Sequence, residues 1–160
     1  MMDARVVNIV IAGLGGQGVL TASDIIAEAA LQAGFDVKKS EVHGMSQRGG
    51  SVTSDVRYGV EVFSPMVPPG EADFLLVLSP DEVENNRWRL RPGGALLGPD
   101  AIGEQALASQ KTLNVALLGA LSRHLEIPDQ HWSAAIRATL PGKLHPMNLE
   151  AFETGRHPRA

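Results

Sequence analysis

A glycine-rich turn near the N-terminus is the part of the sequence best suited to chemistry. The segment GLGGQG, residues 13–18, follows an apolar run at residues 6–12 and precedes residues with helical spacing. A strand that leads into such a turn and then into a helix presents unpaired backbone N–H groups, which bind anions such as a pyrophosphate or a carboxylate. The residues predicted to contact this anion are Gly13, Gly15, Gly16, Gln17 and Gly18.

Two nucleotide-binding patterns share glycines with this turn. Gly13, Gly15 and Gly18 fit the dinucleotide pattern, which also needs an acidic residue roughly 20 positions later, after a second parallel strand. The candidate acid is Glu41, but another glycine-rich turn and another strand follow it. The P-loop pattern fails because Val19 stands where a lysine is required. A dinucleotide site and a turn that serves only tight helix-to-sheet packing remain alternatives.

A second unusual stretch, EVHGMSQRGGSV at residues 41–52, combines acid, imidazole, hydroxyl, amide and guanidinium groups with three glycines. Such a composition is typical of a loop shaped for contact rather than for a buried core. We therefore predict that this loop binds a partner or a ligand. The residues concerned are Glu41, His43, Met45, Ser46, Gln47, Arg48 and Gly49.

The hydrophobic pattern predicts one α/β domain over residues 1–160, with a Rossmann-like, open, mostly parallel sheet and helices on both faces. Residues 37–43 and 51–58 are predicted strands, and the connection of about eight residues between them is too short for a parallel crossover, so they form an antiparallel hairpin. The apolar run at residues 74–78 is a predicted parallel strand beside residues 6–12. The loops after these two parallel strands then share one sheet edge, where open α/β sheets bind ligands.

Shorter patterns complete the expected fold. Residues 60–63 and 95–97 are predicted short strands, and residues 64–70 are a stiff proline-rich loop. Helices are expected at residues 81–90, 112–125, 129–140 and 148–154 from apolar spacing and proline or glycine boundaries. Within the second of these, Gly119 permits close approach of a neighbouring element. Asn114 could make a polar contact, but a capping or surface role near the helix start is favoured.

Composition excludes several classes of function. A net charge of -4 disfavours nucleic-acid binding. No stretch approaches the ~20 apolar residues of a membrane span, and no signal peptide is recognisable, so we expect a cytoplasmic protein. The chain has no cysteine, so it cannot supply thiolate ligands to an iron–sulfur cluster. The histidines lack metal-ligand spacing, no Gly-Asp-Gly magnesium motif is present, and no G-x-S-x-G elbow suggests a hydrolase.

The motifs GLGGQG and EVHGMSQRGGSV, with a late NLEAFETG, resemble one known family. The chain is similar to the small beta subunit of indolepyruvate:ferredoxin oxidoreductase and to the gamma domain of related 2-oxoacid:acceptor oxidoreductases. The resemblance covers residues 8–155, and the stretch between Leu97 and Thr112 is shorter than in the family. A related pyruvate or 2-oxoglutarate:ferredoxin oxidoreductase subunit is an alternative, as is a free-standing dinucleotide-binding oxidoreductase.

The resemblance implies a noncatalytic subunit within a hetero-oligomer. Its large alpha subunit would carry thiamine diphosphate, Mg²⁺ and [4Fe–4S] clusters, convert an aryl 2-oxoacid to an acyl-coenzyme A, and pass electrons to ferredoxin. The glycine turn and the loop at residues 41–52 would face that subunit. Arg48 and the N–H groups at residues 15–18 would bind coenzyme A phosphates. Alternatively, His43, Gln47 and Arg48 form only the subunit interface.

Overall fold

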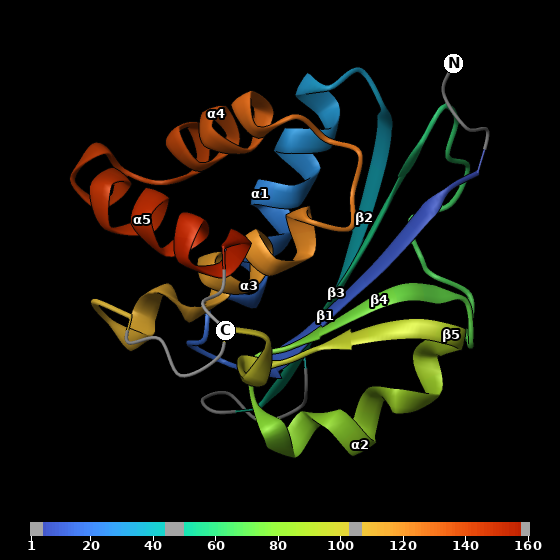
Figure 1. Cartoon of the computed structure of the whole chain (residues 1–160). Helices are drawn as coiled ribbons and strands as arrows, with labels where there is room; N and C mark the ends of the chain where they lie inside the picture. The colour runs from blue at the N-terminus through green and yellow to red at the C-terminus, as the bar shows by residue number, and fades with distance from the viewer. Residues whose placement is uncertain (1–4, 44–49, 103–106, 158–160) are drawn as a thin grey trace.

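The computed structural model describes residues 5–43, 50–102 and 107–157 of the chain. A five-stranded sheet with the order β2-β3-β1-β4-β5 runs through its middle (Figure 1). The strands are β1 (Val7–Leu14), β2 (Asp36–His43), β3 (Ser51–Gly59), β4 (Ala72–Val77) and β5 (Leu90–Leu97).

β1 occupies the centre of the sheet, with four consecutive residues, Ile9 to Ala12, fully buried. Such a run is expected of a strand that is covered on both faces. β1 is parallel to β4, and β2 and β3 form an antiparallel hairpin, as predicted. The α/β fold class is confirmed.

The sheet is mixed, because the parallel part is smaller than we expected. β3 returns from the hairpin directly beside β1 and pairs with it antiparallel from Val7↔Tyr58 to Leu14↔Ser51. Two of the four strand pairings are therefore antiparallel, namely β2 with β3 and β3 with β1, and two are parallel.

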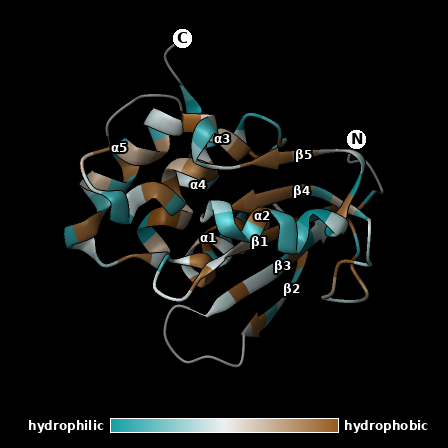
Figure 2. Cartoon of the chain, turned by 90° about the horizontal axis from the view of Figure 1, so that it is seen from below, coloured by the Kyte–Doolittle hydropathy of each residue, from teal (hydrophilic) through white to brown (hydrophobic). Residues whose placement is uncertain are grey.

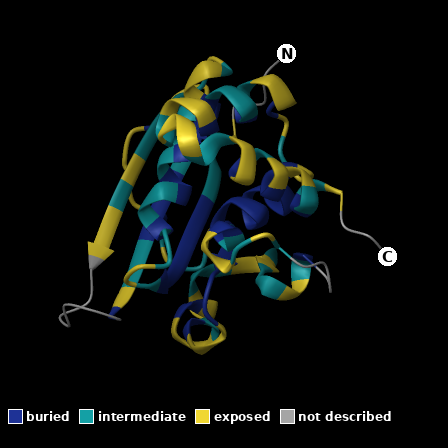
Figure 3. Ribbon diagram, turned by 90° about the vertical axis from the view of Figure 1, so that its left-hand side faces the viewer, coloured by how far each residue is buried: buried dark blue, intermediate teal, exposed yellow. Residues whose placement is uncertain are grey.

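Four helices cover one face of the sheet, and α2 covers part of the other (Figures 1 and 2). The main apolar core lies between the sheet and the four helices, and Figure 3 shows this buried interior behind exposed outer helix faces. The predicted arrangement of helices on both faces is confirmed. The helices are α1 (Val19–Gln32), α2 (Val83–Asn86), α3 (Leu113–Ser122), α4 (Asp129–Thr139) and α5 (His145–Arg156). Among the described residues, no helix has the combined length and hydropathy needed to span a bilayer.

Three predicted elements differ in detail. The predicted strand at residues 60–63 is irregular, because the Val62 N–H donates to the Asp36 carboxylate at 2.8 Å rather than to a neighbouring strand. The predicted helix at residues 81–90 consists of α2 between two short 3₁₀ turns, η1 (Pro80–Glu82) and η2 (Arg87–Arg89). Ser79 precedes η1 without a side-chain capping bond. β5 begins before the expected residues 95–97, with an irregularity in its pairing to β4.

A buried ion pair holds the proline-rich loop against the uncovered part of the sheet. The Asp55 carboxylate accepts hydrogen bonds from the Arg89 guanidinium at 2.7 Å and from the Val67 backbone N–H at 2.9 Å. Arg57 also donates to the Ser64 carbonyl at 2.8 Å. Residues 64–70 are therefore held by two side chains of β3, one of which is paired with Arg89 of η2, rather than by regular backbone pairing.

Candidate functional site

The glycine turn joins β1 to α1 with little free space. A Cβ atom at Gly13 would lie 2.9 Å from the Gln17 Oε1 atom and 2.9 Å from a methyl group of Val19. Gly18 has φ +81°, which favours glycine, and a Cβ there would lie 2.4 Å from the Asn114 amide nitrogen. The turn therefore serves tight packing, one of the two roles considered for it from the sequence.

The Gln17 side chain closes the turn from within. Its Oε1 atom accepts a hydrogen bond from the Leu14 N–H at 2.7 Å, and its backbone N–H donates to the Leu14 carbonyl at 3.1 Å. The N–H of Gly15 donates to the Gly50 carbonyl at 2.9 Å, so the turn is also tied to the start of β3. The N–H groups of Leu14 and Gly15 are thus already paired, unlike the open turn that a ligand would need there.

The first turn of α1 offers donors that the glycine turn does not. Gly18 is the N-cap residue and supplies no side-chain capping bond, and no acidic residue lies in the first turn. The N–H groups after Gly18 therefore keep the partial positive charge of a helix N-terminus. An anion approaching α1 would meet these groups rather than the paired N–H groups of residues 14 and 15.

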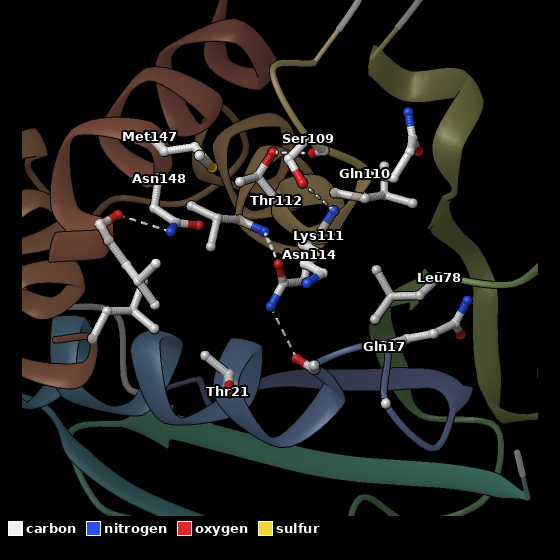
Figure 4. Close-up of a pocket in the computed structure, with 16 residues that line it drawn as sticks. Gln17, Thr21, Leu78, Ser109, Gln110, Lys111, Thr112, Asn114, Met147 and Asn148 are labelled. Carbon is white, nitrogen blue, oxygen red and sulfur yellow. Dashed lines mark hydrogen bonds between the residues drawn. The ribbon is translucent and has the colours of Figure 1, made fainter. Parts of the chain in front are cut away.

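A cavity of about 740 Å³ lies at this end of α1 (Figure 4). Its volume is in the range typical of small-molecule sites. The lining comes from the glycine turn, from the start of α3 with the 3₁₀ turn η4 (Gln110–Thr112) before it, and from the start of α5. The residues that could contact a ligand through polar groups include Gln17, Thr21, Ser109, Lys111, Asn114 and Asn148.

Asn114 connects the two helices that meet at the cavity. Its Nδ2 atom donates to the Gly18 carbonyl at 3.2 Å, and its Oδ1 atom accepts from the Val115 N–H at 2.9 Å (Figure 4). The predicted capping role is wrong, because the N-cap of α3 is Thr112, without a side-chain capping bond, and the Asn114 amide instead makes a tertiary polar contact with Gly18. The alternative surface position is wrong, because Asn114 is only 6% exposed.

Lys111 and Asn148 were not singled out from the sequence. Lys111 is exposed beside the start of α3, and Asn148 is buried on α5, where its amide donates to the Leu144 carbonyl at 2.9 Å. A lysine just before a helix N-terminus is a local signal that the sequence does offer. Nothing local shows that Asn148, from the last helix, reaches the same cavity.

At the glycine-turn end of the sheet, a buried carboxylate links the segment after β4 to the start of β3. Glu82, which is 4% exposed, accepts a hydrogen bond from the Ser51 hydroxyl at 2.7 Å. Because the glycine turn is bonded to Gly50, the segments after β1 and β4 and the base of the hairpin loop meet at one edge. The expectation that the loops after the two parallel strands share an edge is confirmed.

The predicted contact residues of the hairpin fall into two groups. Glu41 lies on β2 and pairs with Lys39 at 3.3 Å, and His43 is the last residue of β2, opposite Val52. Glu41 does not belong to the lining of the 740 Å³ cavity. The others lie outside the described residues: Met45, Ser46, Gln47, Arg48 and Gly49.

The sheet order argues against the dinucleotide alternative. In a dinucleotide-binding unit the strand after the first helix lies parallel to the first strand and places an acidic residue near the glycine turn. Here β2 is separated from β1 by β3 and pairs antiparallel with β3. Glu41 is therefore on the edge strand and bonded to Lys39, so it cannot serve as the ribose ligand.

The described residues also do not fit a metal, cluster or thiamine diphosphate site. Across residues 5–43, 50–102 and 107–157, no three His, Asp or Glu side chains gather as metal ligands do. The whole sequence contains no cysteine to bind an iron–sulfur cluster and no Gly-Asp-Gly motif for the magnesium of thiamine diphosphate. The cavity suits a bound anion better than a metal, because its charged group is the cation Lys111.

Comparison with known protein families assigns the chain to one of them. The family model described as "Pyruvate ferredoxin/flavodoxin oxidoreductase" matches residues 8–102 and 100–157. The chain belongs to this family. The matches cover most of the chain, and they include the glycine turn, the hairpin and the helices around the cavity. Both the resemblance inferred from the motifs and the family it named are confirmed.

Within the pyruvate ferredoxin/flavodoxin oxidoreductase family, the chain is similar to a subunit named for indolepyruvate. It is 36% identical to the "Indolepyruvate oxidoreductase subunit IorB" of Thermococcus kodakarensis over 188 aligned positions, which cover 92% of this chain and 93% of the relative. Since 188 positions exceed the 160 residues of the chain, the relative carries residues that this chain lacks. The family matches meet at residues 100–102, inside the stretch that we predicted to be short.

Solved structures of family members share the fold. The gamma subunit of keto/oxoacid ferredoxin oxidoreductase from Geobacter sulfurreducens superposes with a TM-score of 0.77 at 22% identity, covering 95% of each chain. A 2-oxoglutarate:ferredoxin oxidoreductase from Magnetococcus marinus, solved with 2-oxoglutarate, coenzyme A and succinyl-CoA, matches with a TM-score of 0.77 at 21% identity. That match covers 96% of this chain and 31% of the larger one. The fold thus occurs both as a separate subunit and within a longer chain.

Proposed function

We propose that the chain is the small subunit of an indolepyruvate-type 2-oxoacid:ferredoxin oxidoreductase. The observation that carries this proposal is the 36% identity to an IorB subunit over 92% of the chain. In the reaction, an aryl 2-oxoacid loses carbon dioxide, its acyl group is transferred to the coenzyme A sulfur, and the two electrons released reduce ferredoxin. The chain itself supports this reaction and does not carry it out alone.

The division of labour follows from the side chains present. A large subunit would hold thiamine diphosphate, Mg²⁺ and [4Fe–4S] clusters, and it would supply the decarboxylation and the electron transfer. This chain offers no thiolate, and its described residues offer no cluster of acidic or imidazole ligands. Its contribution is a rigid α/β surface with one anion-suited cavity, which supports a role in binding and positioning.

The cavity at α1 and α3 is the proposed contact for the phosphate groups of coenzyme A. Lys111 supplies a positive charge, and the first turn of α1 supplies backbone N–H donors. Gly16, Gln17 and Gly18 shape the wall of the cavity, and the N–H groups of Leu14 and Gly15 are already paired within the protein. Arg48 remains a predicted second cation for the same phosphates.

Lys111 should contribute to the affinity of the assembled enzyme for coenzyme A. In the assembled enzyme, Lys111→Ala removes a charge-assisted hydrogen bond to phosphate, so we expect the KM for coenzyme A to rise about tenfold while kcat changes little. Steady-state kinetics with varied coenzyme A measures both constants. Arg137→Ala is the matched control, because Arg137 is an exposed cation on α4 outside the cavity lining. A KM that Lys111→Ala and Arg137→Ala leave equally unchanged contradicts the coenzyme A role.

The alternative is that the same residues bind only the large subunit, and the same variants separate the two roles. If Lys111 is an interface residue, Lys111→Ala weakens association of the subunits and leaves the KM for coenzyme A unchanged once the subunits are mixed at saturating concentration. Co-expression with a tagged large subunit tests the assembly itself. We expect both chains to be recovered in one complex, and recovery of the small chain as a separate species would contradict the proposed function.

A further inference from the structure

Two helices begin at the cavity of about 740 Å³, and their first turns lie close together there. The N-cap residue of α1 is Gly18 and that of α3 is Thr112, and both line the cavity. Neither helix has a side-chain capping bond or an acidic residue in its first turn. Because helix N-termini carry partial positive charge, two of them at one cavity repel each other unless a specific contact holds them together.

Asn114 supplies that contact (Figure 4). Its Nδ2 atom donates to the Gly18 carbonyl at 3.2 Å, across 96 positions of the sequence. The same carbonyl accepts the Ala22 N–H at 3.0 Å, the first hydrogen bond within α1. The Asn114 Oδ1 atom accepts the Val115 N–H at 2.9 Å, which fixes the orientation of the amide. Asn114 is only 6% exposed and is bonded through both amide atoms, so it holds the first turn of α1 at a set position relative to α3.

The backbone at position 18 is shaped for this contact. Gly18 has φ +81°, a conformation that favours glycine. A Cβ atom there would lie 3.1 Å from the Asn114 Cγ atom and closer still to the amide nitrogen. The Asn114 amide therefore fills space that any other residue at position 18 would need, and the close approach of the two helix ends depends on both residues.

The contact joins the two sources of phosphate donors at the cavity. Lys111 belongs to η4, which leads directly into α3, and it supplies the positive charge of the lining. The N–H donors follow Gly18 in the first turn of α1. A phosphate that contacts both sources binds more tightly when they are already held in place, because less ordering is then required on binding.

We propose that Asn114 is a positioning residue for the phosphate groups of coenzyme A. It acts through the Gly18 carbonyl: the hydrogen bond keeps the first-turn N–H groups of α1 beside the segment that carries Lys111, so that one phosphate group contacts both. This role rests on the proposed binding of coenzyme A at the cavity. Loss of the bond removes neither donor, but it lets α1 and α3 move apart, and the affinity for phosphate falls.

The test uses the assembled enzyme and adenosine 3′,5′-bisphosphate, which carries phosphate groups of coenzyme A without its thiol. Calorimetric titration measures the dissociation constant of the bisphosphate, and steady-state kinetics measures kcat and the KM values for coenzyme A and indolepyruvate. In Asn114→Ala we expect the dissociation constant and the KM for coenzyme A each to rise about tenfold, with kcat and the KM for indolepyruvate little changed. A purely structural role would instead lower the amount of active enzyme, and therefore kcat, and leave both KM values unchanged.

Two further variants make the result specific. Asn114→Asp keeps an acceptor for the Val115 N–H but loses the donor to Gly18, so thermal unfolding should show a retained fold. Its KM for coenzyme A should rise more than about tenfold, because the new carboxylate also repels phosphate. Asn86→Ala is the matched control, since Asn86 is 5% exposed and its amide donates to the Glu82 carbonyl at 2.9 Å, outside the cavity lining. It should change neither the dissociation constant nor the KM for coenzyme A.

Three outcomes would overturn the role of Asn114: an unchanged KM for coenzyme A in Asn114→Ala and Asn114→Asp, an equal rise in the KM for indolepyruvate, or an equal rise in Asn86→Ala. If Lys111→Ala raises the KM for coenzyme A and Asn114→Ala does not, the coenzyme A site stands and only the positioning role is wrong. Failure of the proposed function itself has a different signature. The unmodified assembly then neither binds the bisphosphate nor reduces ferredoxin in a coenzyme A-dependent way, which overturns both proposals.

Discussion

Gly155→Ala is expected to destabilise the chain by about 3 kcal/mol, the upper end of the usual cost of overpacking. A Cβ atom at Gly155 would lie 1.7 Å from the carbonyl oxygen of Ala116 and 2.7 Å from its carbonyl carbon. Because the obstructing atoms belong to the backbone of α3, no side-chain rotation relieves the contact. α5 would have to move away from α3, and the cavity that both helices line would change shape with them.

The same packing predicts a reciprocal result at α3. A Cβ atom at Gly119 would lie 2.0 Å from the carbonyl oxygen of Phe152 on α5, so Gly119→Ala should cost a similar amount. Gly142→Ala is the control, since nothing lies within 4 Å of a Cβ there and its φ is not in the left-handed region. Urea unfolding measures all three. A midpoint for Gly155→Ala equal to that for Gly142→Ala would contradict the close approach of α3 and α5.

Asp55→Ala is expected to cost about 3–5 kcal/mol, the typical result of breaking a buried ion pair on one side. The Arg89 and Asp55 side chains are only 11% and 7% exposed, and the pair is 2.7 Å long. Removing the carboxylate leaves a buried guanidinium and the Val67 N–H without their acceptor. The Arg89 Nε atom already has no hydrogen-bond partner among the described residues, so the loss is not readily compensated.

Two comparisons isolate this ion pair. The double variant Asp55→Ala/Arg89→Met removes both charges, so it should recover much of the stability lost in Asp55→Ala. The control Glu84→Ala breaks an exposed ion pair, in which the Glu84 side chain is 80% exposed and the Arg87 side chain 55%. This change should cost less than about 0.5 kcal/mol. Denaturant midpoints with unchanged m-values provide the test. If Asp55→Ala and Glu84→Ala cost the same, the anchoring role of Asp55 is wrong.

Local patterns in the sequence predicted much of the fold. The apolar runs at β1 and β4 and the short connection between β2 and β3 each carry their structure within a few residues, because strand period and loop length are local properties. The α4 boundaries followed from Pro128 and Pro141 for the same reason. The antiparallel pairing of β1 with β3 was missed, since that partnership joins residues about 40 to 50 positions apart and leaves no local signal.

The candidate site was predictable only in part. The glycine turn was recognised from its spacing, but its paired N–H groups depend on how Gln17 folds back and on the position of Gly50. The cavity is built from residues 16–21, 109–115 and 140–148, which only the packing of α3 and α5 brings together. Lys111 and Asn148 therefore emerged from the structure. The contacts proposed for residues 45–49 stay predictions.

The most direct test of the central claim measures ferredoxin reduction with indolepyruvate and coenzyme A as substrates. Three samples are compared: this chain alone, the purified large subunit alone, and an equimolar mixture of the two. Our account predicts turnover in the mixture and essentially none in either subunit by itself. Turnover by this chain alone, or an equal rate from the large subunit with and without it, would contradict the account.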